Sequence, residues 1–201
     1  MRAWSRLPAA LAALALTSCQ QASPSPSSRP EPGGPSPVRS AATEAGAAPF
    51  AVLPCGEAID SRTVPLPDQE VVLGVVALHT SQAAPFALQT SRSGEADPAA
   101  RLFSKSGLEV KSRTAFEIVV PDEVASRLSI GWGSPARRTR RLAVPGCDSD
   151  SPWLVYAGGY WVWQAACQPL LVRAGRREQR VLVGIGAPCP GQQPPPQPTE
   201  T

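Results

Sequence analysis

His79 is the one histidine of this sequence, and histidine is the side chain best suited to act as a general base near neutral pH. It ends the apolar run VVALH, and no G-x-S-x-G elbow, serine–lysine motif or phosphate-binding loop accompanies it. A histidine without a nucleophile and an orienting group is more often structural than catalytic. We therefore expect that the protein is not an enzyme, and keep a hydrolase that uses His79 as the alternative.

The cysteines offer a second kind of chemistry, which is oxidation to disulfides. The sequence has five, at Cys19, Cys55, Cys147, Cys167 and Cys189. Four of them form two disulfides if Cys19 has another role, and four cysteines allow three pairings. We favour Cys147–Cys167, because the chain between them resembles a hairpin, and Cys55–Cys189, which would join the two ends of the domain. No CxxC or Cys/His cluster is present, so we predict no metal site and no cofactor.

Aromatic side chains gather in the stretch WLVYAGGYWVW. They are candidate ligand contacts, because an outward strip of rings on a strand stacks on sugars or forms a protein-binding hot spot. The alternative is that the rings pack in the core, and we favour it. Ala157-Gly158-Gly159 is expected to be the turn of a hairpin between two aromatic strands, since glycine readily takes a positive φ. The candidates are Trp153, Tyr156, Tyr160, Trp161 and Trp163.

Charge gives little evidence for a polyanionic partner. The formal net charge of +3 is too small to indicate nucleic acid binding, so we predict none. Arginines cluster at 136–141 and 173–180, where they are expected to be solvated turn and edge-strand residues, with contact to anionic lipids or cell-wall polymers as the alternative. Asp148 and Asp150 lie in a stretch too short to supply the oxygen ligands of calcium, and are expected to form a turn.

Short apolar runs rich in Val, Leu, Ile and aromatic residues recur between Gly, Pro, Ser and Asp from residue 50 to 190. Runs of this kind without intervening helices are typical of all-β folds. We predict a single antiparallel β-sandwich, Ig-like or similar, over 50–190, with a second hairpin that turns around 175–178. Residues 19–49 and 191–201 are rich in proline and poor in bulky apolar residues, so we expect disordered tails there.

The first residues have the layout of a secretory signal. Arg2 and Arg6 precede the apolar run 9–16, which is far shorter than the roughly 20 residues that a membrane-spanning helix needs. The following Leu16-Thr17-Ser18-Cys19 resembles the lipobox of bacterial lipoproteins. This resemblance implies a signal peptide at 1–18 that is removed before Cys19, and a lipid attached to the Cys19 sulfur.

The implied anchor places the protein on the extracytoplasmic face of the cell membrane, or at the outer membrane if the host has two membranes. The tail 19–49 would then be a tether between the lipid and the domain. The domain resembles the uncharacterised exported domains of bacterial lipoproteins, without a named functional family. We expect a binding or structural module that holds an envelope protein or glycan; an envelope-acting hydrolase that uses His79 remains the alternative.

Overall fold

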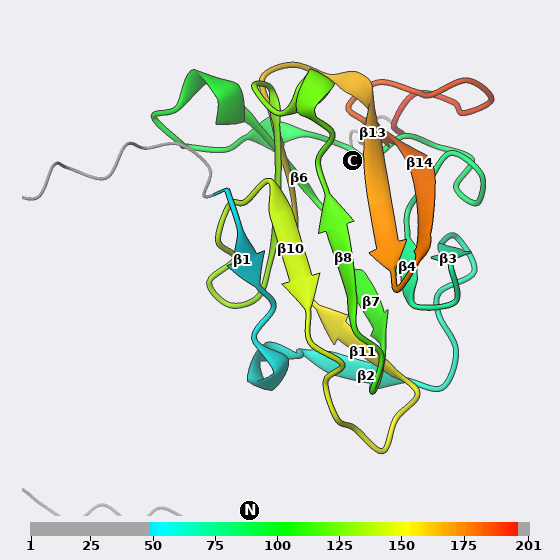
Figure 1. Cartoon of the computed structure of the whole chain (residues 1–201). Helices are drawn as coiled ribbons and strands as arrows, with labels where there is room; N and C mark the ends of the chain where they lie inside the picture. The colour runs from blue at the N-terminus through cyan, green and yellow to red at the C-terminus, as the bar shows by residue number, and fades with distance from the viewer. Residues whose placement is uncertain (1–48, 197–201) are drawn as a thin grey trace, which may run out of the picture. The chain divides into compact units, whose positions relative to one another are not determined.

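The computed structural model describes residues 49–196, which form an all-β structure (Figure 1). Its strands are short because Gly, Pro, Ser and Asp interrupt the apolar runs. The strands are β1 (Ala51–Val52), β2 (Asp60–Arg62), β3 (Glu70–Val72), β4 (Val76–Leu78), β5 (Ser91–Arg92), β6 (Leu102–Lys105), β7 (Leu108–Lys111), β8 (Phe116–Val119), β9 (Leu128–Trp132), β10 (Arg141–Val144), β11 (Trp153–Tyr156), β12 (Gly158–Val162), β13 (Ala166–Ala174) and β14 (Arg177–Ile185). Short 3-10 turns are η1 (Cys55–Glu57), η2 (Pro98–Ala100) and η3 (Asp122–Val124).

The strands form three sheets. Sheet I has the order β1-β10-β8-β13-β14, sheet II the order β2-β11-β7-β4-β3, and sheet III the order β5-β6-β12-β9. All pairs of named strands are antiparallel except β1 with β10. In Figure 1 sheet I faces the viewer, and β7, β11 and β2 lie behind its lower end. The prediction of an all-β, mainly antiparallel fold is confirmed, and the packed sheets are consistent with a β-sandwich.

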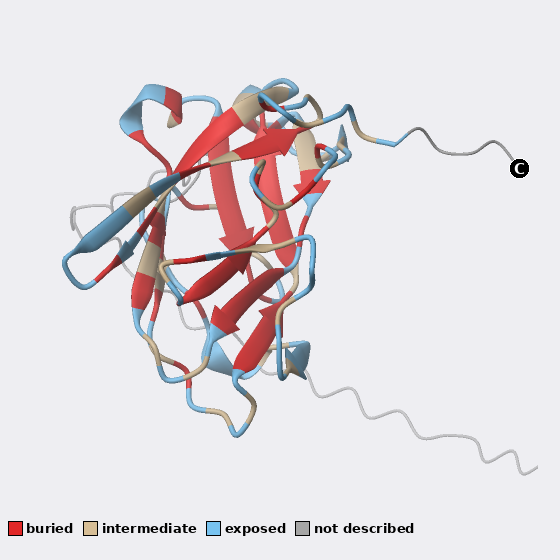
Figure 2. Cartoon of the chain, turned by 90° about the vertical axis from the view of Figure 1, so that its right-hand side faces the viewer, coloured by how far each residue is buried: buried red, intermediate tan, exposed pale blue. Residues whose placement is uncertain are grey.

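The core lies between the inner faces of the sheets. Figure 2 shows its buried residues in red along the strands, with exposed residues concentrated in the loops. The alternation of side chains along a strand sends every second residue inward. In β13, for example, Leu170 and Val172 are fully buried, whereas Arg173 is exposed. The largest fully buried side chains are Tyr156, Tyr160, Leu53, Leu78, Leu108, Ile118, Leu128, Ile130, Leu142, Leu170, Ile185 and Gln168.

The predicted hairpin at 157–159 is wrong. β11 pairs with β7 and β12 pairs with β6, and both pairings have the same register, from Tyr156 opposite Leu108 to Gly159 opposite Lys105. The run 153–162 is therefore one long strand that passes from sheet II to sheet III beside the run 102–111. We call this pair of runs the crossover ribbon. Instead of forming a turn, Gly158 and Gly159 lie where the neighbouring strands β9 and β6 approach β12 closely.

The second predicted hairpin is confirmed. β13 and β14 pair along their whole lengths, from Ala166 opposite Ile185 to Ala174 opposite Arg177. Gly175, with a φ of 60°, and Arg176 form the turn between them. Glycine suits this position because a left-handed backbone strains other residues.

The four cysteines of the domain are all in disulfides, but the predicted pairing is wrong. Cys55 is bonded to Cys147, and Cys167 is bonded to Cys189. The prediction relied on the hairpin at 157–159, which would have brought residues 147 and 167 together. Because the chain crosses between sheets there instead, Cys147 reaches η1, and Cys167 reaches the segment after β14.

The described chain continues past the boundary predicted at residue 190. Gln193 forms a parallel β-bridge with Phe86, and its carbonyl accepts the amide of Ala87 at 2.9 Å. Gln192 also donates to the carbonyls of Ala84 and Phe86. The predicted tail at 191–201 is therefore partly incorporated into the fold.

The signal peptide, Cys19 and almost all of the tether lie outside the described residues. So do residues 197–201 of the predicted C-terminal tail. Within 49–196 no helix has the length and apolar character needed to cross a membrane.

Candidate functional site

The five candidate aromatic residues do not form an outward strip. Trp153, Tyr156, Tyr160 and Trp161 are at most 8% exposed, and Trp163 alone is open to solvent, at 47%. Tyr156 and Tyr160 point into the core, where Tyr160 packs edge-on against Trp132 at 5.4 Å between ring centroids. Burial of the Tyr160 hydroxyl raises its pKa. Four of the five rings are therefore buried, but only Tyr156 and Tyr160 belong to the core.

Trp153 points away from the core, and a loop accounts for its burial. The connection at 63–69 runs from β2 to β3, which are the opposite edges of sheet II, so it must cross a face of that sheet. We call it the strap. Its Leu66 amide donates to both carboxylate oxygens of Glu109, at 3.3 and 3.4 Å, and the Glu109 side chain is 1% exposed. Glu109, Trp153 and Val155 alternate with core residues on their strands, so the strap covers their face.

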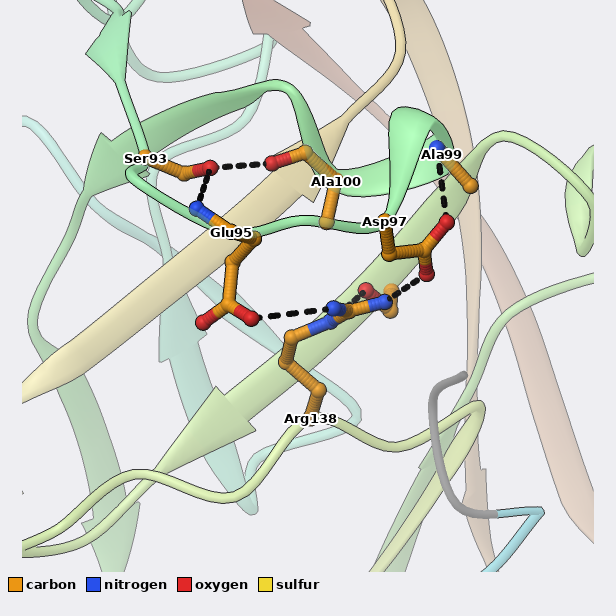
Figure 3. Close-up of polar contacts among 7 residues, drawn as sticks. Ser93, Glu95, Asp97, Ala99, Ala100 and Arg138 are labelled. Atoms are coloured by element: carbon orange, nitrogen blue, oxygen red, sulfur yellow. Dashed lines mark hydrogen bonds and ion pairs between the residues drawn. The ribbon is translucent and has the colours of Figure 1, made fainter. Parts of the chain in front are cut away.

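Trp161 likewise points away from the core, on sheet III. It stacks on Phe103 with ring centroids 4.7 Å apart. Two loops meet over this sheet through Arg138, and Figure 3 shows the contact, which we call the Arg138 clasp. The Arg138 guanidinium lies 2.5 Å from Asp97 and 3.4 Å from Glu95, and is also 3.4 Å from the Ser129 hydroxyl. The Arg138 side chain is only 11% exposed.

Asp97 has two roles in the clasp. It caps η2 by accepting the Ala99 amide at 2.9 Å, and its other oxygen holds Arg138. The hydrogen bond from Arg138 lowers the pKa of the Asp97 carboxyl, against the opposing effect of partial burial. Each of the three guanidinium nitrogens of Arg138 faces an acceptor of the protein, which is the arrangement of a structural contact between loops.

His79 lies beside a backbone carbonyl and a carboxylate in the described part of the chain. Its Nε2 donates to the carbonyl of Phe86 at 2.9 Å, and its Nδ1 lies 3.7 Å from a carboxylate oxygen of Asp68. Within 49–196 no serine hydroxyl hydrogen-bonds to the ring. A general base must reach the proton it removes, and here the ring nitrogens already face other partners.

The remaining charged candidates are occupied by neighbours. In the cluster at 173–180, Arg173 pairs with Glu178 at 2.6 Å and Arg180 pairs with Glu123 at 2.8 Å. In the turn at 148–150, a hydrogen bond from Arg113 lowers the pKa of Asp148. Within the described residues no three His, Cys, Asp or Glu side chains are arranged to hold a metal ion.

One of the hollows on the described part of the chain was not indicated by the sequence. It has a volume of about 440 Å³ and lies between β1 and the loop after β9. Its walls are mainly apolar, and we call it the β1 groove. The residues that line it include Phe50, Val52, Pro54, Trp132, Pro135 and Leu142. Ligand sites are concave and mostly apolar, with volumes of roughly 300–1,000 Å³, so this hollow is of the right kind.

Glu57 and Arg137 are the charged residues of the groove wall. The Glu57 carboxylate accepts the amide of Ser134 at 2.6 Å, which ties η1 to the loop after β9. Arg137 is exposed, and no carboxylate of the described residues pairs with it. At the rim, the guanidinium of Arg141 lies over the Phe50 ring, 5.7 Å from its centroid.

Folding brings the two walls of the groove together from distant parts of the sequence. Parallel pairing places Ala51 opposite Leu142, and so sets β1 beside the end of the 133–140 loop. Sequence reasoning missed the site because it assigned no strand to Ala51 and Val52, although both lie inside the predicted domain. The available signal was the apolar run PFAVLP, which begins where the polar tail ends.

No family model matches this chain, and no curated protein or solved structure is significantly similar to it. The site must therefore be interpreted from its own geometry.

Proposed function

We propose that this chain is a lipid-anchored protein of the extracytoplasmic side of the cell envelope, whose β-domain is a binding module. One observation carries the proposal. Cys55, Cys147, Cys167 and Cys189 are consumed by two disulfides, which leaves Cys19 of the LTSC motif as the single remaining cysteine of the sequence. Disulfides persist in exported proteins and are rare in the cytosol.

The anchor is compatible with a domain that needs no membrane contact of its own. Two acyl chains hold a protein stably, whereas a single chain gives only marginal binding. A diacylglyceryl group on Cys19 would be enough, and residues 20–48 would connect it to the domain.

Binding is favoured over catalysis because the molecule offers an open groove. The β1 groove is concave and mainly apolar, and its Arg137 lacks a carboxylate partner in the described chain. By contrast, His79 has a carbonyl and a carboxylate beside it and no serine. No specific observation supports the hydrolase alternative.

The test of the anchor is substitution of Cys19. We expect Cys19→Ala to block lipid attachment and signal removal, so that the protein accumulates as a precursor of higher mass. In the protein without the substitution, mass spectrometry of the N-terminal peptide should find a lipid on Cys19. Ser18→Ala is the matched control, because it keeps a small residue before the cysteine. An unmodified Cys19 thiol in the native protein would exclude the proposal.

A further inference from the structure

The exposed edge of β1 has backbone groups that no strand satisfies. Ala51 of β1 and Leu53, the residue after it, face β10: the Leu53 amide donates to the carbonyl of Ala143 at 2.8 Å. In a parallel ladder every second residue of a strand bonds to a given neighbour, so the N–H and C=O of Val52 point away from β10. No residue within 49–196 hydrogen-bonds to either group. An extended backbone is the partner that satisfies both groups at once.

We infer that the β1 groove binds an extended peptide segment of a partner protein, which adds a strand beside Val52. Strand addition is a general mode of peptide recognition, in which backbone hydrogen bonds give affinity and pockets for alternate side chains give specificity. This inference rests on the binding function proposed above and names its partner class.

The groove supplies the pocket that this mode requires. Phe50 and Val52 are 49% and 53% exposed at its rim, and Pro54, Trp132, Pro135 and Leu142 line its walls. Trp132 is held in place by the hydrogen bond of its indole N–H to the carbonyl of Ser106, at 2.9 Å. A side chain of the added strand that enters the hollow is therefore expected to be apolar.

Charge selects the peptide further. Arg138 and Arg141 are each paired with a carboxylate of the domain, whereas Arg137 at the same wall has none in the described chain. Glu57 also lines the groove and keeps its charge while it accepts the Ser134 amide, but it forms no ion pair with Arg137 in the described chain. An acidic side chain next to the apolar one would pair with Arg137. The partner is thus an extended segment that combines an apolar and an acidic residue.

The test uses the full mature chain in detergent micelles and a phage-displayed library of random peptides of about eight residues, the length of a typical strand. Selected sequences are made as synthetic peptides, and their affinities are measured by fluorescence anisotropy. We expect enrichment of peptides that carry an acidic residue close to a bulky apolar one.

Two pairs of variants locate the binding. Val52→Pro removes the outward N–H, whereas Val52→Thr keeps it. We expect only the proline variant to bind the peptide about tenfold more weakly. This loss corresponds to the upper range for one hydrogen bond. Arg137→Glu reverses the groove charge, whereas Arg176→Glu makes the same change in the distant β13–β14 turn. We expect the groove variant alone to weaken binding by about tenfold or more.

Val52→Pro could weaken binding by misfolding β1. Arg137→Glu tests the groove without this problem, because Arg137 is an exposed loop residue. Selected peptides that bind both Val52→Pro and Arg137→Glu as tightly as the unmodified chain would overturn the inference, and so would a selection that enriches nothing. Neither result tests the proposed lipid anchor, which is detected separately by mass spectrometry of the N-terminal peptide.

Discussion

Glu109 shows how one buried carboxylate holds a loop. Its side chain is almost fully enclosed between sheet II and the strap, and the Leu66 amide is its hydrogen-bond donor. The nearest cation is Arg62, whose Nε lies 3.8 Å away. Burial is the largest influence and raises the pKa of Glu109, while the Leu66 hydrogen bond and Arg62 oppose it. The effect of burial on the pKa of Glu109 is thus larger than the opposing effect of its hydrogen-bond and ionic partners.

A raised pKa means that the folded protein binds this proton more tightly than the unfolded chain. The contribution of Glu109 to stability is therefore greatest below its ordinary pKa of 4.5, and declines as the pH rises through the folded value. We predict that Glu109→Gln, which keeps an oxygen for the Leu66 amide, removes this decline. In urea denaturation, the free energy of unfolding of the variant should rise relative to that of the unmodified protein between pH 4.5 and neutral pH. A difference that does not change with pH would contradict the prediction.

Polar residues within short strands limited how many strands could be predicted from the sequence. The runs at 102–105 and 108–111 became β6 and β7, yet neither was recognised as a strand, because each is short and holds lysine or serine. Glu109 looks like a solvated strand residue until the strap is placed over it. The apolar runs at 170–172 and 181–185, in contrast, were assigned correctly, because their own residues determine their structure without a covering loop.

At the scale of elements, the crossover ribbon explains the main error of the sequence analysis. Glycine pairs between aromatic strands indicate either a tight turn or a close approach of backbones, and the sequence does not distinguish the two. Here a Cβ at Gly158 would overlap the carbonyl of Gly131, and one at Gly159 would overlap that of Ser104. Both glycines are needed because β9 and β6 flank β12 on its two sides.

The Arg138 clasp is the second feature of element scale, since it joins the loop before β6 to the loop after β9. We predict that Arg138→Gln loosens the clasp, because it leaves Asp97 and Glu95 without their cation. Hydrogen bonds to charged groups contribute about 1.5–3 kcal/mol, and Arg138 is mostly buried, so a loss in this range is expected. Hydrogen exchange should become faster in residues 93–100.

The pH dependence of the clasp has the opposite sign to that of Glu109. Because Arg138 lowers the pKa of Asp97, the stabilisation is present above the ordinary pKa of 3.8 and is lost as the pH falls through the folded value. The Arg138→Gln variant should lack this acid-dependent loss. Arg101→Gln, at an exposed arginine beside η2, is the control. Equal exchange rates in both variants would show that the ion pairs do not hold the loops.

At the scale of the whole molecule, each disulfide ties a segment near one end of the described chain to another part of the fold. Cys55–Cys147 joins η1 to the segment after β10, and Cys167–Cys189 joins the start of β13 to the segment after β14. The sequence predicted that these four cysteines pair, because that follows from counting. The sequence could not predict which cysteines pair, because the pairing depends on how the chain crosses from sheet II to sheet III in the crossover ribbon.

The two disulfides should differ in how much they stabilise the fold. A cross-link restricts the unfolded chain more when it closes a longer loop, and the sequence separations are 92 and 22 residues. The loop-entropy relation gives about 4.5 kcal/mol for Cys55–Cys147 and about 3.5 kcal/mol for Cys167–Cys189. We predict that the double variant Cys55→Ser/Cys147→Ser unfolds at a lower urea concentration than Cys167→Ser/Cys189→Ser. Because Cys55 lies between Pro54 and Glu57 of the groove wall, its loss should weaken peptide binding as well, whereas loss of Cys167–Cys189 should leave binding unchanged. The reverse order of stability would mean that the unfolded chain is already restricted near β1, so that the longer cross-link has little entropy left to remove.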